Sequence, residues 1–285
     1  MPEEVSDGSP QVTFSVLGRD PVTGELGVGV ASCVLAVGRA VPWAKAGVGV
    51  VVTQSQTRRG YGPHALAGLE AGVPADQVLR TLLRRDAGAS GRQVAVLAAD
   101  GVVAVHTGEG CLDTSGDRYG DGWSVQGNLL RSPAVLDAMA DAYVHSSLPL
   151  AERLLTALEA GEAVGGDLRG RQSAALLVVG GRRLAEPWDA VAVDLRVDHA
   201  LEPLAQLRQL LSLQRAYEDG DSAMLADAAP DSTRAVHAAL DAARRGDLEG
   251  ARAALAELRR KPEWEEWLRS GAVAGRFPNL TRLLD

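Results

Sequence analysis

Two hydroxyl side chains, Thr13 and Ser15, stand at the head of the first apolar run of the chain. They are two residues apart, so in a β-strand both point to the same face. A hydroxyl that attacks an amide also needs a base to take its proton and donors that stabilise the oxyanion. The pair therefore indicates a possible nucleophile for the hydrolysis of an amide. The structural alternative is that Thr13 stands there because threonine favours strands.

Two glycine-containing segments offer the remaining parts of such a site. We expect Gln126 and Asn128, which flank Gly127, to supply oxyanion donors, because glycine lets backbone N–H groups approach a substrate closely. In the Gly-rich loop that follows residue 164, Asp167 is expected to orient Arg169 or the nucleophile. The planar Arg169 guanidinium suits a substrate carboxylate. The structural alternative for Gln126-Gly127-Asn128 is an ordinary turn, and that for Asp167 and Arg169 is a surface ion pair.

Further polar side chains close the predicted strands and are assigned to substrate binding. This set is Ser32, Thr53, Gln54, His106, Arg169, Gln172 and Ser173. For His106, the structural alternative is a histidine that is simply hydrogen-bonded at the end of a strand. The chain has 2 cysteines and contains neither a CxxC pair nor a Cys/His cluster, so we expect no metal and no cofactor.

Apolar patterning divides the first two thirds of the chain into paired strands and paired helices. Strands are predicted over residues 12–17, 26–32, 46–54, 93–99, 102–107, 123–128, 173–179 and 188–197, and helices over 62–71, 74–86, 133–145 and 148–161. Such pairing differs from the strict alternation of a parallel doubly wound sheet. It predicts an α+β fold, a four-layer αββα sandwich of two mainly antiparallel sheets with helix pairs on their outer faces.

The pattern changes near residue 199, after which only helices are predicted, over 204–219, 232–245, 248–261 and 264–274. The expected organisation is a disordered extension over 1–11, an αββα domain over 12–200 and a small all-α domain over 201–285.

Charge and composition limit the classes of partner. The formal net charge is −8 and the isoelectric point is near 5.2, which argues against nucleic acid or an anionic membrane surface as partner. The polar, acidic N-terminal segment lacks the features of a signal peptide, and no long apolar run is present. We therefore expect a cytoplasmic protein without membrane contact.

In their order along residues 12–200, these motifs resemble the domain of unknown function 1028 family, which is assigned to the N-terminal nucleophile (Ntn) hydrolase-like superfamily. The motifs that carry the resemblance are Thr13-Phe14-Ser15, Arg19-Asp20-Pro21, Thr23-Gly24, Gly27-Val28, Val30-Ala31-Ser32, Val37-Gly38, Val41-Pro42, Ala46-Gly47-Val48-Gly49, Thr53-Gln54, Tyr61-Gly62-Pro63, His106-Thr107-Gly108, Gln126-Gly127-Asn128, Gly165-Gly166-Asp167, Arg169-Gly170, Gln172-Ser173-Ala174-Ala175 and Asp194-Leu195-Arg196-Val197-Asp198.

The resemblance implies the αββα sandwich and a nucleophile whose own α-amine acts as the base. Many relatives carry Met directly before this Thr and others a signal peptide, whereas here Met1 to Val12 precede Thr13. The first hypothesis is thus a metal-independent amidohydrolase acting on a small linear or cyclic amide, and the expected partner is a small-molecule amide or peptide ligand. Either the bond before Thr13 is cut, or the protein works differently, or the ancestral chemistry is lost. The alternatives are a non-catalytic small-molecule or peptide binder and an assembly module whose C-terminal helices form a homo-oligomer.

Overall fold

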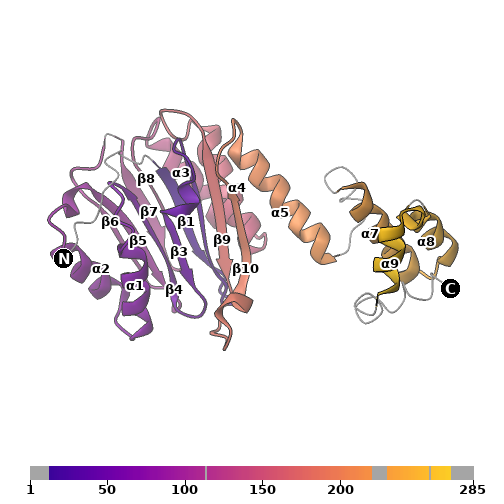
Figure 1. Ribbon diagram of the computed structural model, residues 1–285. Helices are drawn as coiled ribbons and strands as arrows, with labels where there is room; N and C mark the ends of the chain where they lie inside the picture. The colour runs from indigo at the N-terminus through magenta and orange to yellow at the C-terminus, as the bar shows by residue number, and fades with distance from the viewer. Residues whose placement is uncertain (1–12, 113, 220–229, 257, 271–285) are drawn as a thin grey trace. The chain divides into compact units, whose positions relative to one another are not determined.

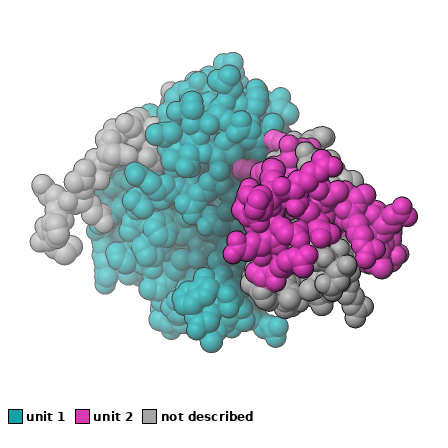
Figure 2. Space-filling view, turned by 45° about the vertical axis from the view of Figure 1, so that its right-hand side comes forward, with its two compact units in different colours: residues 1–208 teal, residues 209–285 magenta. Residues whose placement is uncertain are grey.

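The computed structural model describes residues 13–112, 114–219, 230–256 and 258–270. The extension predicted over residues 1–11 lies outside this part of the chain. Two compact units are present, residues 1–208 and residues 209–285, coloured separately in Figure 2. Helix α5 (Pro203–Asp219) contains the division between them.

An antiparallel six-stranded sheet, with strand order β10-β9-β2-β1-β8-β7, occupies the centre of the first unit (Figure 1). Its strands are β1 (Thr13–Arg19), β2 (Leu26–Ser32), β7 (Gly116–Gly120), β8 (Trp123–Gly127), β9 (Ser173–Val179) and β10 (Val191–Val197). The predicted first hairpin is confirmed. In its turn, Asp20 Oδ1 accepts the N–H groups of Val22 and Thr23 at 2.8 Å each, and Gly24 takes a φ of 75°.

A second antiparallel sheet has the order β3-β4-β5-β6. Its strands are β3 (Pro42–Lys45), β4 (Gly49–Ser55), β5 (Arg92–Ala98) and β6 (Val103–Thr107). The β5–β6 hairpin turns at Asp100-Gly101 as predicted, with Gly101 at a φ of 96° and Asp100 Oδ1 accepting the Val102 N–H at 3.0 Å.

The strand predicted over residues 46–54 begins too early. Gly47 lies in a turn with a φ of 62°, and the strand starts only at Gly49. The residues before this turn form β3. Neither β3 nor β7 is predicted from the sequence. Both are short, and β7 contains no aliphatic side chain that could reveal it by alternation.

Helices cover the outer faces of the two sheets. Helices α3 (Ala134–His145) and α4 (Leu150–Ala163) pack on the six-stranded sheet, where Gly27 and Gly29 leave room for Leu154 and Leu158 of α4. Helices α1 (Tyr61–Glu70) and α2 (Ala75–Arg84) pack on the four-stranded sheet.

Between the sheets lies an apolar core to which strands of both sheets contribute. Its buried members are Leu17, Leu26, Val28, Val30, Val37, Val41, Val50, Val52, Ala95, Leu97, Ala175 and Val179. Strand alternation selects those members that lie in strands, because their neighbours in sequence face the outer helices, whereas Val37 and Val41 come from the segment between β2 and β3. The mixed α+β class and the two antiparallel sheets agree with the prediction.

The second unit is helical in its described part. After α5 come α7 (Asp231–Arg244), α8 (Leu248–Leu255) and α9 (Pro262–Arg269), and Asp247 caps α8 by accepting the Gly250 N–H at 2.8 Å. A small alanine- and leucine-rich cluster holds α7 and α8 together. In the described ranges, none of the helices combines the length and apolar character needed to cross a membrane.

Candidate functional site

The space between the sheets changes from apolar to polar towards the start of β1. Along β1, Leu17 belongs to the core, and Ser15 and Thr13 follow on the same face. Register places Thr13 opposite Ser32 of β2, and Ser32 opposite Ser173 of β9. Three hydroxyl residues therefore lie in a row across three strands, all buried.

Thr13 donates from Oγ1 to Ser32 Oγ at 3.3 Å. Its carbonyl oxygen accepts the backbone N–H of Asn128 and the side-chain amide of Gln54, each at 3.2 Å. Because Val12 precedes it, the nitrogen of Thr13 in the uncut chain is a peptide amide, which cannot act as a base. The uncut chain therefore has a positioned hydroxyl without the neighbouring amine.

Ser15 has a different environment, because its hydroxyl is saturated by two amides. Its Oγ donates to Gln54 Oε1 at 2.7 Å and accepts from Gln126 Nε2 at 2.6 Å. Ser124 completes the set by donating to Gln126 Oε1 at 3.0 Å. All four side chains are at most 1 % exposed. The structure thus joins Ser15 and Gln126 to the amide network rather than to the Thr13 hydroxyl.

Gln93, which the sequence reasoning missed, connects the two sheets. Its Nε2 donates to the carbonyl oxygens of Gly127 and Gly116 at 2.9 and 3.0 Å. Its Oε1 accepts from Gln54 Nε2 at 2.8 Å and from Asn128 Nδ2 at 3.0 Å. The sequence pattern could have revealed Gln93, because it stands two residues before Ala95 and four before Leu97, and alternation places all three on the inward face of the same strand.

Asn128 carries a buried acceptor that lacks a partner. Its Nδ2 points at two acceptors, Gln93 Oε1 and the Thr13 carbonyl, and this fixes the orientation of the amide. In the described part of the chain, nothing donates to Asn128 Oδ1, although it is buried. An unpaired buried acceptor costs about 1–3 kcal/mol, so the position favours a donor that the described residues do not provide.

Asp167 and Arg169 lie beside the end of β2. Asp167 Oδ2 accepts the Cys33 N–H and the Arg169 guanidinium, each at 3.0 Å, and Oδ1 accepts the Arg169 backbone N–H at 2.9 Å. The Asp167 side chain is 1 % exposed, whereas that of Arg169 is 33 % exposed. Positive φ at Gly165, Gly166 and Gly170 forms the loop that holds this pair next to Ser32-Cys33.

The other predicted side chains do not enter the network. Thr53 Oγ1 donates to the Arg58 carbonyl at 3.2 Å, and His106 Nε2 lies 2.9 Å from the Ala89 carbonyl. Both residues alternate with inward-facing neighbours and therefore face away from the space between the sheets. Gln172 contacts His199, and Ser173 Oγ donates to the Val34 carbonyl and accepts the Val37 N–H.

Clusters of three or more potential metal ligands are absent from the part of the chain that the structure describes. Burial raises the pKa of Glu162, which lies beside the Gly166 backbone, and its ion pair with Arg171 opposes that rise. The polar end of the inter-sheet space is thus built mainly from hydroxyls and amides, with the hydrogen-bonded carboxylates of Asp167 and Asp117 at its margins.

Comparison with known proteins identifies the family to which the first unit is similar. The sequence model of DUF1028, a family of unknown function, matches residues 13–207. A crystal structure of a Silicibacter pomeroyi protein of the same family model superimposes with a TM-score of 0.64 and 32% sequence identity, over 72% of this chain and 86% of that one. No match was found among curated proteins. By this match over residues 13–207, the chain belongs to the DUF1028 family, whose function is unknown.

Proposed function

We propose that the first unit is an Ntn-type amidohydrolase that acts on a small linear or cyclic amide without a metal. The two facing antiparallel sheets with helices on their outer faces support the four-layer αββα sandwich of the Ntn-hydrolase-like superfamily. The observation that carries the proposal is the Thr13 hydroxyl at the start of β1, which donates to Ser32, together with Asn128 Oδ1, which has no partner among the described residues.

The proposed chemistry begins with cleavage of the Val12–Thr13 bond, which converts the Thr13 nitrogen into an amine. The amine takes the Oγ1 proton as Oγ1 attacks the substrate carbonyl carbon, and then gives that proton to the departing amine. Water hydrolyses the resulting ester and regenerates the hydroxyl. Asn128 Oδ1 would accept a hydrogen bond from the new amine or from a substrate N–H group, and Asp167 with Arg169 would orient the substrate.

The test compares the full-length chain with a chain whose mature first residue is Thr13. Intact mass reports whether residues 1–12 are lost, and release of amine from a panel of small linear and cyclic amides reports turnover. We expect turnover only from chains that start at Thr13, and none from the same chains with Thr13→Ala. Ser15→Ala is the control for the neighbouring hydroxyl. Turnover that survives Thr13→Ala would remove Thr13 from the mechanism.

A non-catalytic small-molecule or peptide binder is the second candidate. It is favoured by the 0% exposure of Thr13 in the uncut chain and by the pairing of the Ser15 hydroxyl with two amides. An uncut chain that binds a small amide equally well before and after Thr13→Ala, without releasing amine, would support it. The predicted homo-oligomer stays a prediction, which light scattering of the full chain tests.

A further inference from the structure

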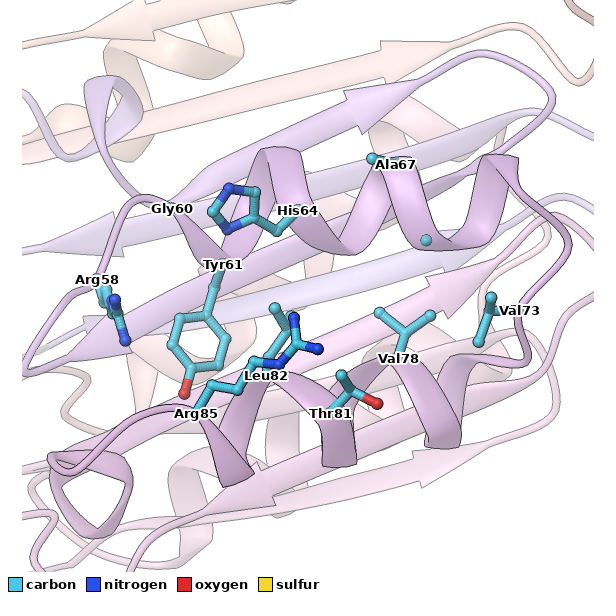
Figure 3. A pocket seen from close by; sticks show the side chains of 11 residues that line it. Arg58, Gly60, Tyr61, His64, Ala67, Val73, Val78, Thr81, Leu82 and Arg85 are labelled. Atoms are coloured by element: carbon cyan, nitrogen blue, oxygen red, sulfur yellow. The ribbon is translucent and has the colours of Figure 1, made fainter. Parts of the chain in front are cut away.

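A cavity of about 510 Å³ lies between α1 and α2 (Figure 3). These helices pack on the outer face of the four-stranded sheet, so the cavity is separated from the Thr13 site by that sheet. Its walls are largely apolar and include Ala67, Val73, Val78 and Leu82. Both volume and lining are typical of sites for small organic ligands, which commonly measure roughly 300–1,000 Å³.

The side chains that line this cavity include two arginines and one histidine, and the lining Arg58 pairs at 3.3 Å with Asp86, which does not itself line the cavity. Arg58, His64 and Arg85 contribute to the lining, and none of the described lining residues is acidic. The chain as a whole carries a formal charge of −8, so the cavity lining is more basic than the rest of the chain. Such a lining favours an anionic ligand over a cationic or neutral one.

Arg85 is the cation placed to bind the anionic group. It follows α2 directly, and its side chain extends into the gap between the two helices (Figure 3). The nearest carboxylate in sequence is Asp86, but its oxygens already accept from Arg92 at 2.8 Å and from Tyr61 at 3.0 Å. Within the described residues no carboxylate pairs with the Arg85 guanidinium.

We propose that this cavity binds a small amphipathic carboxylate, with the carboxylate group on Arg85 and the apolar part against Val78, Leu82 and Ala67. A guanidinium fork matches a carboxylate bidentately, and burial of the apolar part adds a hydrophobic contribution. The site is independent of the proposed hydrolase, because it uses none of the residues around Thr13.

The probe is octanoate, titrated calorimetrically into the full-length protein. We expect saturable binding that Arg85→Glu weakens by at least about tenfold, because the substitution replaces attraction by repulsion. Arg80→Glu is the matched control, since Arg80 lies on α2, the helix that Arg85 follows, in an exposed pair with Asp76 and does not line the cavity. Octan-1-ol, which has the same chain length without the charge, should bind at least about tenfold more weakly than octanoate.

A second variant tests the cavity itself. Ala67→Phe places a large side chain in an exposed lining position, and we expect it to abolish octanoate binding while the thermal unfolding midpoint stays unchanged. Three results would each overturn the proposal: no saturable octanoate binding, equal binding of octan-1-ol, or unchanged affinity in both Arg85→Glu and Ala67→Phe.

Discussion

At the scale of single residues, the unusual feature is a network of uncharged amides between two sheets. Gln54, Gln93, Gln126 and Asn128 bond to one another, to Ser15 and to backbone carbonyl groups. Such a network is stabilising when every member is satisfied and costly when one is removed. Asn128 Oδ1, its one side-chain atom without a partner among the residues that the structure describes, therefore marks the position at which a donor is expected.

Gln93→Leu tests how much this network contributes to stability. Leucine is close in size but leaves Gln54 Nε2 and Asn128 Nδ2 without their shared acceptor, and two carbonyl groups without a donor. We expect the free energy of unfolding, measured with urea, to fall by about 2–4 kcal/mol. Gln77→Leu on the exposed face of α2 is the control and should change it by less than about 0.5 kcal/mol. Equal effects of the two substitutions would contradict a structural role for the network.

The sequence was sufficient to find most of the polar residues but not the face on which each one lies. Thr13, Ser15, Ser32, Gln54, Gln126 and Asn128 were selected by type and by position at strand ends, and the structure brings them to one end of the inter-sheet space. Thr53 and His106 were selected by the same criterion but lie on the opposite face. A displacement of one residue along a strand reverses the direction of a side chain, so type alone could not separate these two groups.

At the scale of elements, Asp86 connects segments that are distant in sequence. It follows α2, accepts from Arg92 at the start of β5 and from Tyr61 at the start of α1, and pairs with Arg58 at 3.3 Å. Burial raises the pKa of its carboxyl group, but the bonds from Arg92, Gly88 and Tyr61 outweigh this and lower that pKa from 3.8 to about 2. Its side chain is 6% exposed, so solvent screens these bonds little.

Acid unfolding should reveal this connection. Because the pKa of Asp86 is lowered in the folded state, the stabilisation is complete above pH 3.8 and is lost as the pH falls towards 2. We expect Asp86→Asn to lower the free energy of unfolding by about 2 kcal/mol at neutral pH and by much less near pH 2. Asp76→Asn, which breaks an exposed pair, is the control. A stability difference between wild type and Asp86→Asn that is independent of pH would argue against the ion-pair explanation.

Element order was predictable because the period of the apolar pattern changes clearly between strands and helices. Both hairpins with Asp-Gly or Asp-Pro…Gly turns were identified, since their turn residues satisfy specific backbone requirements. Strands β3 and β7 were missed because each is short and half-exposed and depends on a neighbouring strand rather than on its own pattern. Each is an edge strand that pairs with the strand following it across a short turn, so its own residues need not show apolar alternation.

At the scale of the whole molecule, the family match and the first compact unit end at almost the same place, residues 207 and 208. The apolar clusters between the sheets and beneath α1 and α2 consist of residues before 180. Helix α5 also contributes to this unit, because Leu207 is buried and Arg208 pairs with Glu159 of α4 at 2.9 Å. The beginning of α5 therefore belongs to the fold of the first unit.

A chain that ends at Asp219 should consequently fold as the full-length protein does in its first unit. We expect cooperative thermal unfolding with a midpoint within about 3 °C of the corresponding full-length transition, followed by circular dichroism. A chain that ends at Glu202 is the matched control. It loses the buried Leu204 and Leu207 and the partner of Glu159, so its midpoint should fall by about 5 °C or more. If the chain ending at Asp219 failed to unfold cooperatively, the helical second unit would be required for the fold of the first, contrary to the division at residue 208.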